Sequence, residues 1–443
     1  MTFFARLDGY LVRRPVAIAL LSLLFLYRLA FGLCSEFWFI DEKQIYLIGL
    51  KFFTTGRWPY FGPDLVLKGH ERIYQIPGAL QGLLVGLPFH VLPIPEAPFV
   101  LLNLLSFGAL VLLAWYGWRR VPALPRWLVF GLALTLPWTL HYSTRVVNPS
   151  YVLAGSVLFF VGAAEALVFP DSPLLPEPLA DALMGMGLLW VLQLHMSWTL
   201  LLPFAAAALV LRARRGDGLR ALGAFATGAA ATGSLLVPTL VVYGLPSAAN
   251  TGIAVRFNPI NARDLGSVIA KVLSFASYEM PRFMGPDNRQ RLAWALSDLR
   301  VTPFAGLTLA VGLLQPIVML LLWLRRAESA PGWRRMKWLM MATLLLTWGA
   351  FLFTVREPWA LTFYLVFPVA FLYSLYCYAF FLKGERWLAF AAVVLVAGLV
   401  ANTALAARNY RERSLYRDRG LVVRAIAERD HTVLGTRRPG TFY

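Results

Sequence analysis

Residues 15–34, PVAIALLSLLFLYRLAFGLC, form the first long apolar stretch of the chain, and Phe39-Ile40-Asp41-Glu42 follows a few residues later. The length of this stretch matches what a helix needs to cross the hydrocarbon core of a membrane. Carboxylates beside a membrane boundary cost desolvation free energy, so those found there commonly have a function. The sequence therefore predicts a membrane protein whose chemistry lies just beyond its first span.

Composition places the whole chain in the membrane class. Of its 443 residues, 59% are hydrophobic and 14% are charged, whereas soluble proteins carry about 25% charged residues. The net charge of +18 does not indicate a nucleic-acid partner, because much of the Lys and Arg lies at the ends of apolar segments. We expect membrane lipids as neighbours and no nucleic acid, and the sequence does not indicate an oligomeric state.

Apolar stretches long enough to span recur along the chain and predict about eleven transmembrane helices. They lie near residues 15–34, 98–118, 127–141, 150–168, 182–195, 196–211, 221–243, 304–324, 338–355, 361–382 and 387–407. Residues 79–92 are apolar but too short to span and contain Pro88, so we expect a helix lying in the membrane interface.

The distribution of basic residues predicts the orientation. Arg and Lys gather at alternate span ends, which places the N-terminus in the cytoplasm and the C-terminus outside. Residues 1–407 then form one transmembrane module, and residues 408–443 form a short outer tail. The outer face also carries a loop over residues 35–97 and a loop over residues 244–303. The second loop contains an amphipathic stretch and is expected to act as a lid.

Asp41-Glu42-Lys43-Gln44 fits a capping box with Asp41 as the N-cap of a helix that stops at Gly56. From local sequence, capping and catalysis are equally good explanations of Asp41. A cap does not explain the second acid, Glu42, and a cap also fixes a carboxylate in place. Both acids are therefore candidate catalytic residues.

Basic and polar residues predicted on the same outer face are candidates for substrate binding. An Arg side chain presents a fork that matches phosphate oxygens, but each candidate also has a structural explanation: membrane snorkelling, a turn or a solvated loop. The donor-phosphate or substrate candidates are Arg28, Arg72, Arg145, His195, Arg356 and Tyr364. The acceptor or loop candidates are His70, Tyr74, His141 and Asn148. The chain has no glycine-rich phosphate loop and no clustered His or Cys ligands, so we expect neither a cofactor nor a metal.

Together these features resemble the GT-C superfamily of membrane glycosyltransferases, which use sugars linked to polyprenyl phosphate. The protein O-mannosyltransferase-like and aminoarabinose-transferase-like members are the most similar. The layout carries the resemblance over most of the chain. The motifs that carry it are Asp41-Glu42, Gly56-Arg57-Trp58-Pro59, Asn148-Pro149-Ser150 and Arg356 with Tyr364-Leu365. Gln75-Ile76-Pro77 departs from the family's Pro-Pro pair, the second outer loop has no carboxylate, and the tail is shorter than some members' C-terminal domains.

The resemblance implies an all-α, polytopic GT-C-like bundle with interfacial helices in its first outer loop. It also implies an inverting transfer of a hexose or pentose from a polyprenyl-phosphate donor to a hydroxyl of a lipid, glycan or protein in the cell envelope. Asp41 takes the role of base, and Arg356, Arg145 or Arg28 binds the lipid phosphate. Two alternatives stay open. One is a lipid flippase or transporter, and the other is a glycan polymerase or ligase that uses a diphosphate-linked lipid donor.

Overall fold

The structure is a computed structural model that describes residues 3–11, 13–35, 40–65, 74–248, 257–275, 277, 284, 287–324, 331–354, 360–412 and 415–435. Helices make up nearly all of the regular structure in these ranges, and a single two-stranded sheet is the exception. The prediction of a helical bundle is therefore confirmed for the described chain, with one small hairpin that the sequence analysis did not predict.

Within the part of the chain that the structure describes, eight helical segments are long and apolar enough to cross a membrane. Five of these segments each correspond to one helix, and the other three each combine shorter neighbouring helices. The segments are Arg14–Ser35 (α2), Ala97–Arg120 (α5), Asn148–Leu167 (α8), Met196–Arg214 (η1 and α10), Gly218–Gly244 (α11, η2 and part of α12), Thr302–Trp323 (α16), Tyr364–Phe381 (η6 and α18) and Glu385–Arg411 (most of α19, Glu385–Glu412).

The other three predicted spans are helical as well, but each is shorter or more polar. Residues 127–141 divide into α6 (Arg126–Thr135) and α7 (Pro137–Tyr142), residues 182–195 correspond to α9 (Glu177–Leu192), and residues 338–355 correspond to α17 (Trp333–Phe351). All eleven predicted segments therefore coincide with helices. The predicted interfacial segment is α4 (Leu80–Val91), a 12-residue helix with Pro88 inside it.

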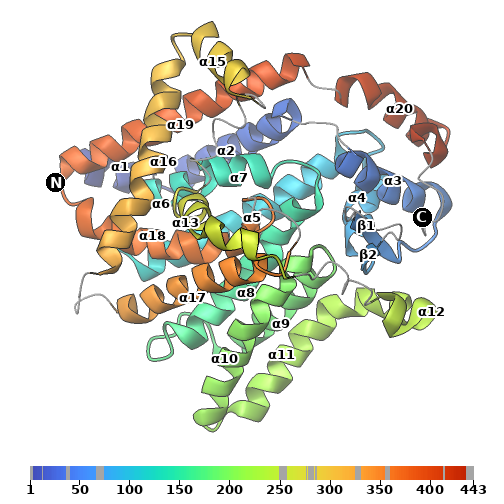
Figure 1. Ribbon diagram of the computed structural model, residues 1–443, viewed down its shortest axis with the longest axis horizontal. Coiled ribbons are helices and arrows are strands. Elements are labelled where there is room, and N and C mark those ends of the chain that lie inside the picture. The colour runs from blue at the N-terminus through green and yellow to red at the C-terminus, as the bar shows by residue number, and fades with distance from the viewer. Residues whose placement is uncertain are drawn as a thin grey trace.

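The first and the last described α-helices lie at opposite ends of the molecule (Figure 1). The N-terminal helix α1 (Phe3–Leu11) lies at one end. At the other end lie α3 (Ile40–Thr55), α4, the hairpin and the C-terminal helix α20 (Leu415–Ala427). These elements follow or precede membrane-length helices, so they form a cap on one end of the bundle, which we call the α3 cap.

The hairpin in the α3 cap joins β1 (Phe61–Leu65) to β2 (Tyr74–Pro77), and the strands are antiparallel. Phe61 lies opposite Pro77 and Asp64 opposite Gln75, with an irregularity in register between Phe61 and Asp64. Gly and Pro are depleted in strands, and β1 contains both in the sequence FGPDL. That composition explains why the sequence alone did not indicate a strand here.

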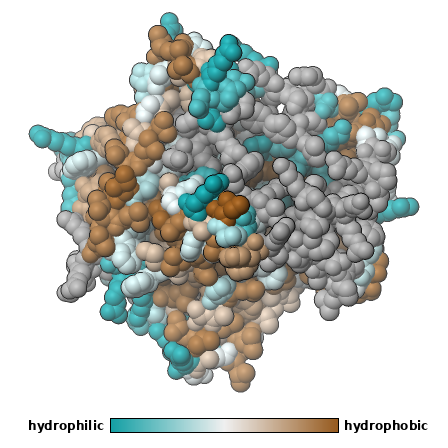
Figure 2. All heavy atoms as spheres, viewed as in Figure 1, coloured by the Kyte–Doolittle hydropathy of each residue, from teal (hydrophilic) through white to brown (hydrophobic). Residues whose placement is uncertain are grey.

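The surface of the bundle carries many large apolar side chains. Figure 2 shows apolar residues over the lower part of the face in view, where Figure 1 places α10 (Leu202–Arg214) and α11 (Gly218–Gly233). Leu202, Val210, Leu219 and Leu222 on these helices are each at least 43% exposed. Large contiguous apolar patches are rare on soluble monomers, so this surface fits contact with lipid.

The segment predicted as a lid contains the expected amphipathic helix, α13 (Leu265–Leu273). Val268, Val272 and Leu273 are buried, and α13 packs against α16, α17 and α18. The remaining described helices of this segment are α12 (Val237–Ala248), the 3-10 helix η4 (Pro259–Asp264) and α15 (Asn288–Ser297). Movement of the segment as a lid stays a prediction.

Candidate active site

Asp41 and Glu42 both lie in the first turn of α3, where carboxylates interact favourably with the positive end of the helix dipole. Because α3 begins at Ile40, the prediction that Asp41 is the N-cap is wrong: it lies inside the helix. The predicted end is confirmed, since α3 ends at Thr55 and Gly56 follows with φ of 66°. This left-handed conformation favours glycine.

The two acids have opposite environments. Asp41 is exposed, whereas Glu42 is only 2% exposed and pairs with Arg145, whose Nη2 lies 2.7 Å from Glu42 Oε1. Desolvation raises the pKa of the Glu42 carboxyl above its usual value, although the adjacent Arg145 guanidinium acts to lower it. One carboxylate is thus available to solvent and its neighbour is held in a buried ion pair.

Arg28 on α2 is fully buried and does not snorkel to the interface. Its Nη1 donates to the carbonyl oxygen of Leu134 at 2.8 Å. Its Nη2 donates to the hydroxyl of Ser143 at 2.8 Å and to the carbonyl of Thr139 at 3.2 Å. Carbonyls at the ends of α6 and α7 lack partners within their own helices, so Arg28 bonds the first span to the α6–α7 break. Phosphate binding by Arg28 stays a prediction.

Three polar candidates close to helix ends make hydrogen bonds within the protein. His141 Nε2 lies 2.9 Å from Asn402 Oδ1 on α19, and Asn148 Nδ2 donates to the carbonyl of Leu194 at 3.1 Å. His195 is the N-cap of η1 (Met196–Leu201), and its Nδ1 accepts from the N–H of Ser197 at 3.1 Å. Asn148 also begins α8, as its Asn-Pro sequence indicates. Substrate contacts for these residues stay predictions.

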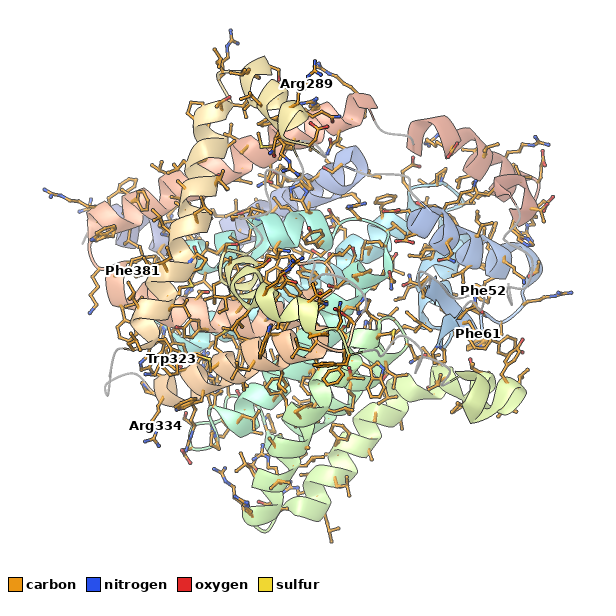
Figure 3. All side chains as sticks on the ribbon, in the orientation of Figure 1. Phe52, Phe61, Arg289, Trp323, Arg334 and Phe381 are labelled. Atoms are coloured by element: carbon orange, nitrogen blue, oxygen red, sulfur yellow. The ribbon has the colours of Figure 1, made fainter. Side chains whose placement is uncertain are left out.

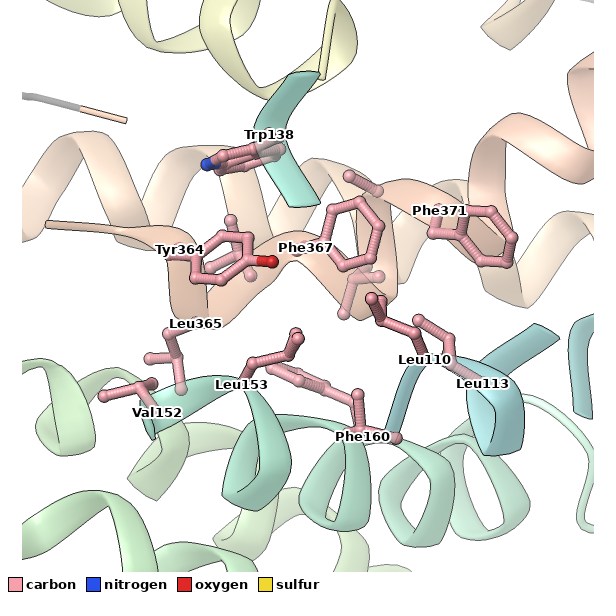
Figure 4. Packing of buried hydrophobic residues seen from close by; sticks show 14 of the residues in the cluster. Leu110, Leu113, Trp138, Val152, Leu153, Phe160, Tyr364, Leu365, Phe367 and Phe371 are labelled. Carbon is pink, nitrogen blue, oxygen red and sulfur yellow. The ribbon is translucent and has the colours of Figure 1, made fainter. Parts of the chain in front are cut away.

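Tyr364 lies in an aromatic cluster in the core (Figure 4). It is 1% exposed, and its ring centroid lies 5.6 Å from that of Trp138 and 5.9 Å from that of Phe367. Tyr142 also contacts it, with centroids 6.3 Å apart. The cluster packs on α8 next to Leu153. Through Tyr142, Tyr364 therefore contacts the chain between Thr139 and Asn148.

The chain between Thr139 and Asn148, which we call the α7–α8 connection, links the candidates that the structure describes. It contacts Arg28 through Thr139 and Ser143 and Tyr364 through Tyr142. It binds Glu42 through Arg145. Candidates from α2, from the start of α3 and from η6 therefore meet around one short segment. His70, Arg72 and Arg356 lie outside the described residues, and Tyr74 is described only as the backbone of β2, paired with Leu65.

The C-terminal segment adds contacts that the sequence analysis missed. Arg419 on α20 makes two hydrogen bonds to Glu96, from Nε to Oε1 at 2.6 Å and from Nη2 to Oε2 at 3.1 Å. His431 Nδ1 lies 3.2 Å from the hydroxyl of Thr54, and the Arg429 guanidinium lies 5.6 Å from the ring centroid of Phe53. The tail thus folds onto α3. No local signal could have indicated this, because the partners are distant in sequence.

A pocket of about 220 Å³ opens in the α3 cap beyond the C-terminal half of α3. We call it the aromatic pocket. Its lining comes from α3, from the turn after it, from the start of β1 and from α12: Ile48, Lys51, Phe52, Arg57, Trp58, Pro59, Tyr60, Phe61 and Tyr243. The Gly56-Arg57-Trp58-Pro59 sequence, already part of the family resemblance, therefore forms a wall of this pocket.

Metal ligands do not gather in the described part of the chain: no three His, Cys, Asp or Glu side chains there are placed to hold an ion. The expectation that the chemistry needs no metal stays a prediction.

Comparison with known proteins finds no family model that matches the chain and no match among curated proteins. Among solved structures, the chain is similar to the crystal structure of ArnT from Cupriavidus metallidurans bound to undecaprenyl phosphate. The two chains are 15% identical, the similarity covers 91% of this chain and 78% of that chain, and the TM-score is 0.46.

Proposed function

We propose that the protein is a membrane glycosyltransferase. It would transfer a sugar from a polyprenyl-phosphate donor to an acceptor hydroxyl at the outer face of the membrane. The observation that carries the proposal is the pair of adjacent carboxylates at the start of α3, one exposed and one buried against Arg145. Membrane-length apolar helices next to this pair suit a donor with a long lipid tail.

The proposed step is a single displacement at the anomeric carbon. The acceptor oxygen forms a bond to that carbon while the bond from the carbon to the phosphate oxygen breaks, which inverts the configuration. Asp41 accepts the acceptor's hydroxyl proton, and polyprenyl phosphate leaves with the bonding electrons. A carboxylate is a weak base, so its contribution depends on correct placement against the acceptor.

Glu42 and Arg145 act together in this proposal. Their 2.7 Å ion pair ties the start of α3 to the α7–α8 connection, which fixes the position of the neighbouring Asp41. Arg145 keeps 15% of its side chain exposed, so its guanidinium is a candidate for stabilising the charge on the departing phosphate. Arg28 supports the same segment from the first span.

The test is a transfer assay on purified protein in lipid nanodiscs. Polyprenyl phosphate carrying a radiolabelled sugar is supplied with a membrane extract as the source of acceptor, and both transferred label and released polyprenyl phosphate are measured. Equal amounts of the two products support the proposal. Lipid-linked sugar that crosses the bilayer of proteoliposomes without bond cleavage would instead identify a flippase. Transfer from a diphosphate-linked donor alone would identify a polymerase or ligase.

A further inference from the structure

The aromatic pocket combines rings, cations and an unpaired donor. Trp58, Tyr60 and Tyr243 contribute aromatic surface, and Lys51 and Arg57 contribute positive charge. No acidic side chain is among the described lining residues. A lining of this kind suits a ligand with apolar faces and negative charge.

The indole N–H of Trp58 supplies a separate indication of a ligand. Its Nε1 atom is buried and has no hydrogen-bond partner among the described residues. A buried donor without a partner is destabilising, and indole N–H groups usually find a partner when buried. A ligand oxygen in the pocket would provide that partner.

The walls of the pocket are held in place by ring contacts among the lining residues and by hydrogen bonds to the chain around them. The ring centroid of Tyr243 lies 5.3 Å from that of Tyr60 and 4.9 Å from that of Phe61. The carbonyl of Tyr60 accepts from the Thr239 hydroxyl at 2.7 Å and from the N–H of Gly78 at 2.9 Å. The turn is therefore bound both to α12 and to the chain after β2. A preformed site loses little entropy when it binds a ligand.

The pocket and Asp41 also share a face of α3. Residues separated by seven and eleven positions lie on the same side of an α-helix, so Ile48 and Phe52, which line the pocket, lie on the side of Asp41. A rise of 1.5 Å per residue puts Asp41 about 10 Å from Ile48 along the axis. An acceptor longer than one sugar ring could therefore occupy the pocket and still present a hydroxyl to Asp41.

We propose that the aromatic pocket binds a negatively charged sugar residue, carrying a carboxylate or a phosphate, of the acceptor glycan. Lys51 and Arg57 face the anion, the rings contact the apolar faces of the sugar, and the Trp58 N–H donates to a ring or hydroxyl oxygen. The identity of this ligand as the acceptor rests on the proposed function, whereas the affinity of the pocket for a charged sugar does not. Figure 3 shows Phe52 and Phe61, two lining residues, close together at this end of the molecule.

The test measures binding by calorimetry on full-length protein in nanodiscs, with trigalacturonate and glucose 6-phosphate as acidic probes and maltotriose as the neutral one. We expect at least one acidic probe to bind more tightly than maltotriose, and the tighter of the two identifies the anion. Arg57→Gln should weaken that binding about tenfold, as expected for loss of one charged hydrogen bond. Trp58→Phe, which keeps a ring, should weaken it about fivefold.

The matched control is Arg289→Gln, which removes the same charge from an exposed position on α15, far from the pocket (Figure 3). It should bind like the wild type. Failure of both acidic probes to bind, or equal binding by the two Arg variants, would overturn the inference. Asp41→Asn should bind the acidic probe normally. Wild-type protein that binds the acidic probe but transfers no sugar would reject the proposed function while supporting the pocket.

Discussion

Arg145→Gln should destabilise the protein far more than the loss of an ordinary surface ion pair. Glu42 is 2% exposed, and its Oε1 atom lies 2.7 Å from Nη2 of Arg145 in a buried ion pair. Removal of one partner from a buried pair leaves a desolvated charge and costs about 3–5 kcal/mol. We expect a loss near 3 kcal/mol at pH 7, at the lower end of that range, because Arg145 keeps 15% of its side chain exposed.

The cost should depend on pH with a definite sign. Without the Arg145 guanidinium, the buried charge of Glu42 is less stable, and Glu42 can lose that charge by binding a proton, which becomes easier as the pH falls. The loss caused by Arg145→Gln should therefore be smaller at pH 5 than at pH 7. The assay is unfolding in mixed micelles with increasing denaturing detergent, followed by tryptophan fluorescence.

Two further variants make the measurement decisive. The double variant Glu42→Gln with Arg145→Gln removes both charges and should recover most of the lost stability. Arg419→Gln breaks a hydrogen-bonded pair with Glu96 in which both side chains are more exposed, 38% and 22%, and should cost about 0–1 kcal/mol. The reasoning is refuted if Arg145→Gln costs no more than Arg419→Gln, or if the double variant recovers nothing.

Three other outcomes are expected from unfolding measurements. Arg28→Met should cost about 3 kcal/mol, because it removes the buried hydrogen bonds from Arg28 to Leu134, Thr139 and Ser143; a loss under about 0.5 kcal/mol, typical of an ordinary surface substitution, would contradict this. Because the folded-state pKa of Glu42 is raised, its contribution is greatest below its unfolded pKa and is lost as the pH rises through the folded value. The stability of wild type relative to Glu42→Gln should therefore decline from about pH 4 upward, and a rise would contradict it. Gly32→Ala should cost about 1–3 kcal/mol, because its new methyl group meets the backbone oxygen of Thr144. Gly108→Ala, which meets nothing within 4 Å on α5, is the control and should cost nothing.

Local sequence was sufficient for features that depend on nearby residues. The apolar segments predicted the helices, Gly56 marked the end of α3, and Asn148 with Pro149 marked the start of α8. Each of these follows from helix length, from the freedom of glycine at positive φ, or from proline in the first helical turn. The apolar segment at residues 79–92 likewise predicted the short helix α4.

Features that depend on distant partners could not be predicted. Glu42 and Arg145 are separated by 103 positions, and Glu96 and Arg419 by 323. Nothing in the local sequence distinguishes Glu42 from its neighbour Asp41, yet only Glu42 is buried. The start of α3 was wrong by one or two positions, a typical uncertainty at helix ends. The aromatic pocket needed α12, far along the chain, to close one wall.

The most direct test of the central claim is sugar transfer by Asp41→Asn. Asn keeps the shape of the side chain but cannot accept the proton, so transfer should be lost while stability and donor binding stay at wild-type levels. Glu42→Gln, which loses the orienting ion pair, should retain more activity than Asp41→Asn. The matched control is Asp287→Asn, at the N-cap of α15, where Asn also caps well; this variant should transfer normally. Transfer by Asp41→Asn near the wild-type rate, or loss of transfer together with loss of folding, would contradict the assignment of Asp41 as the base.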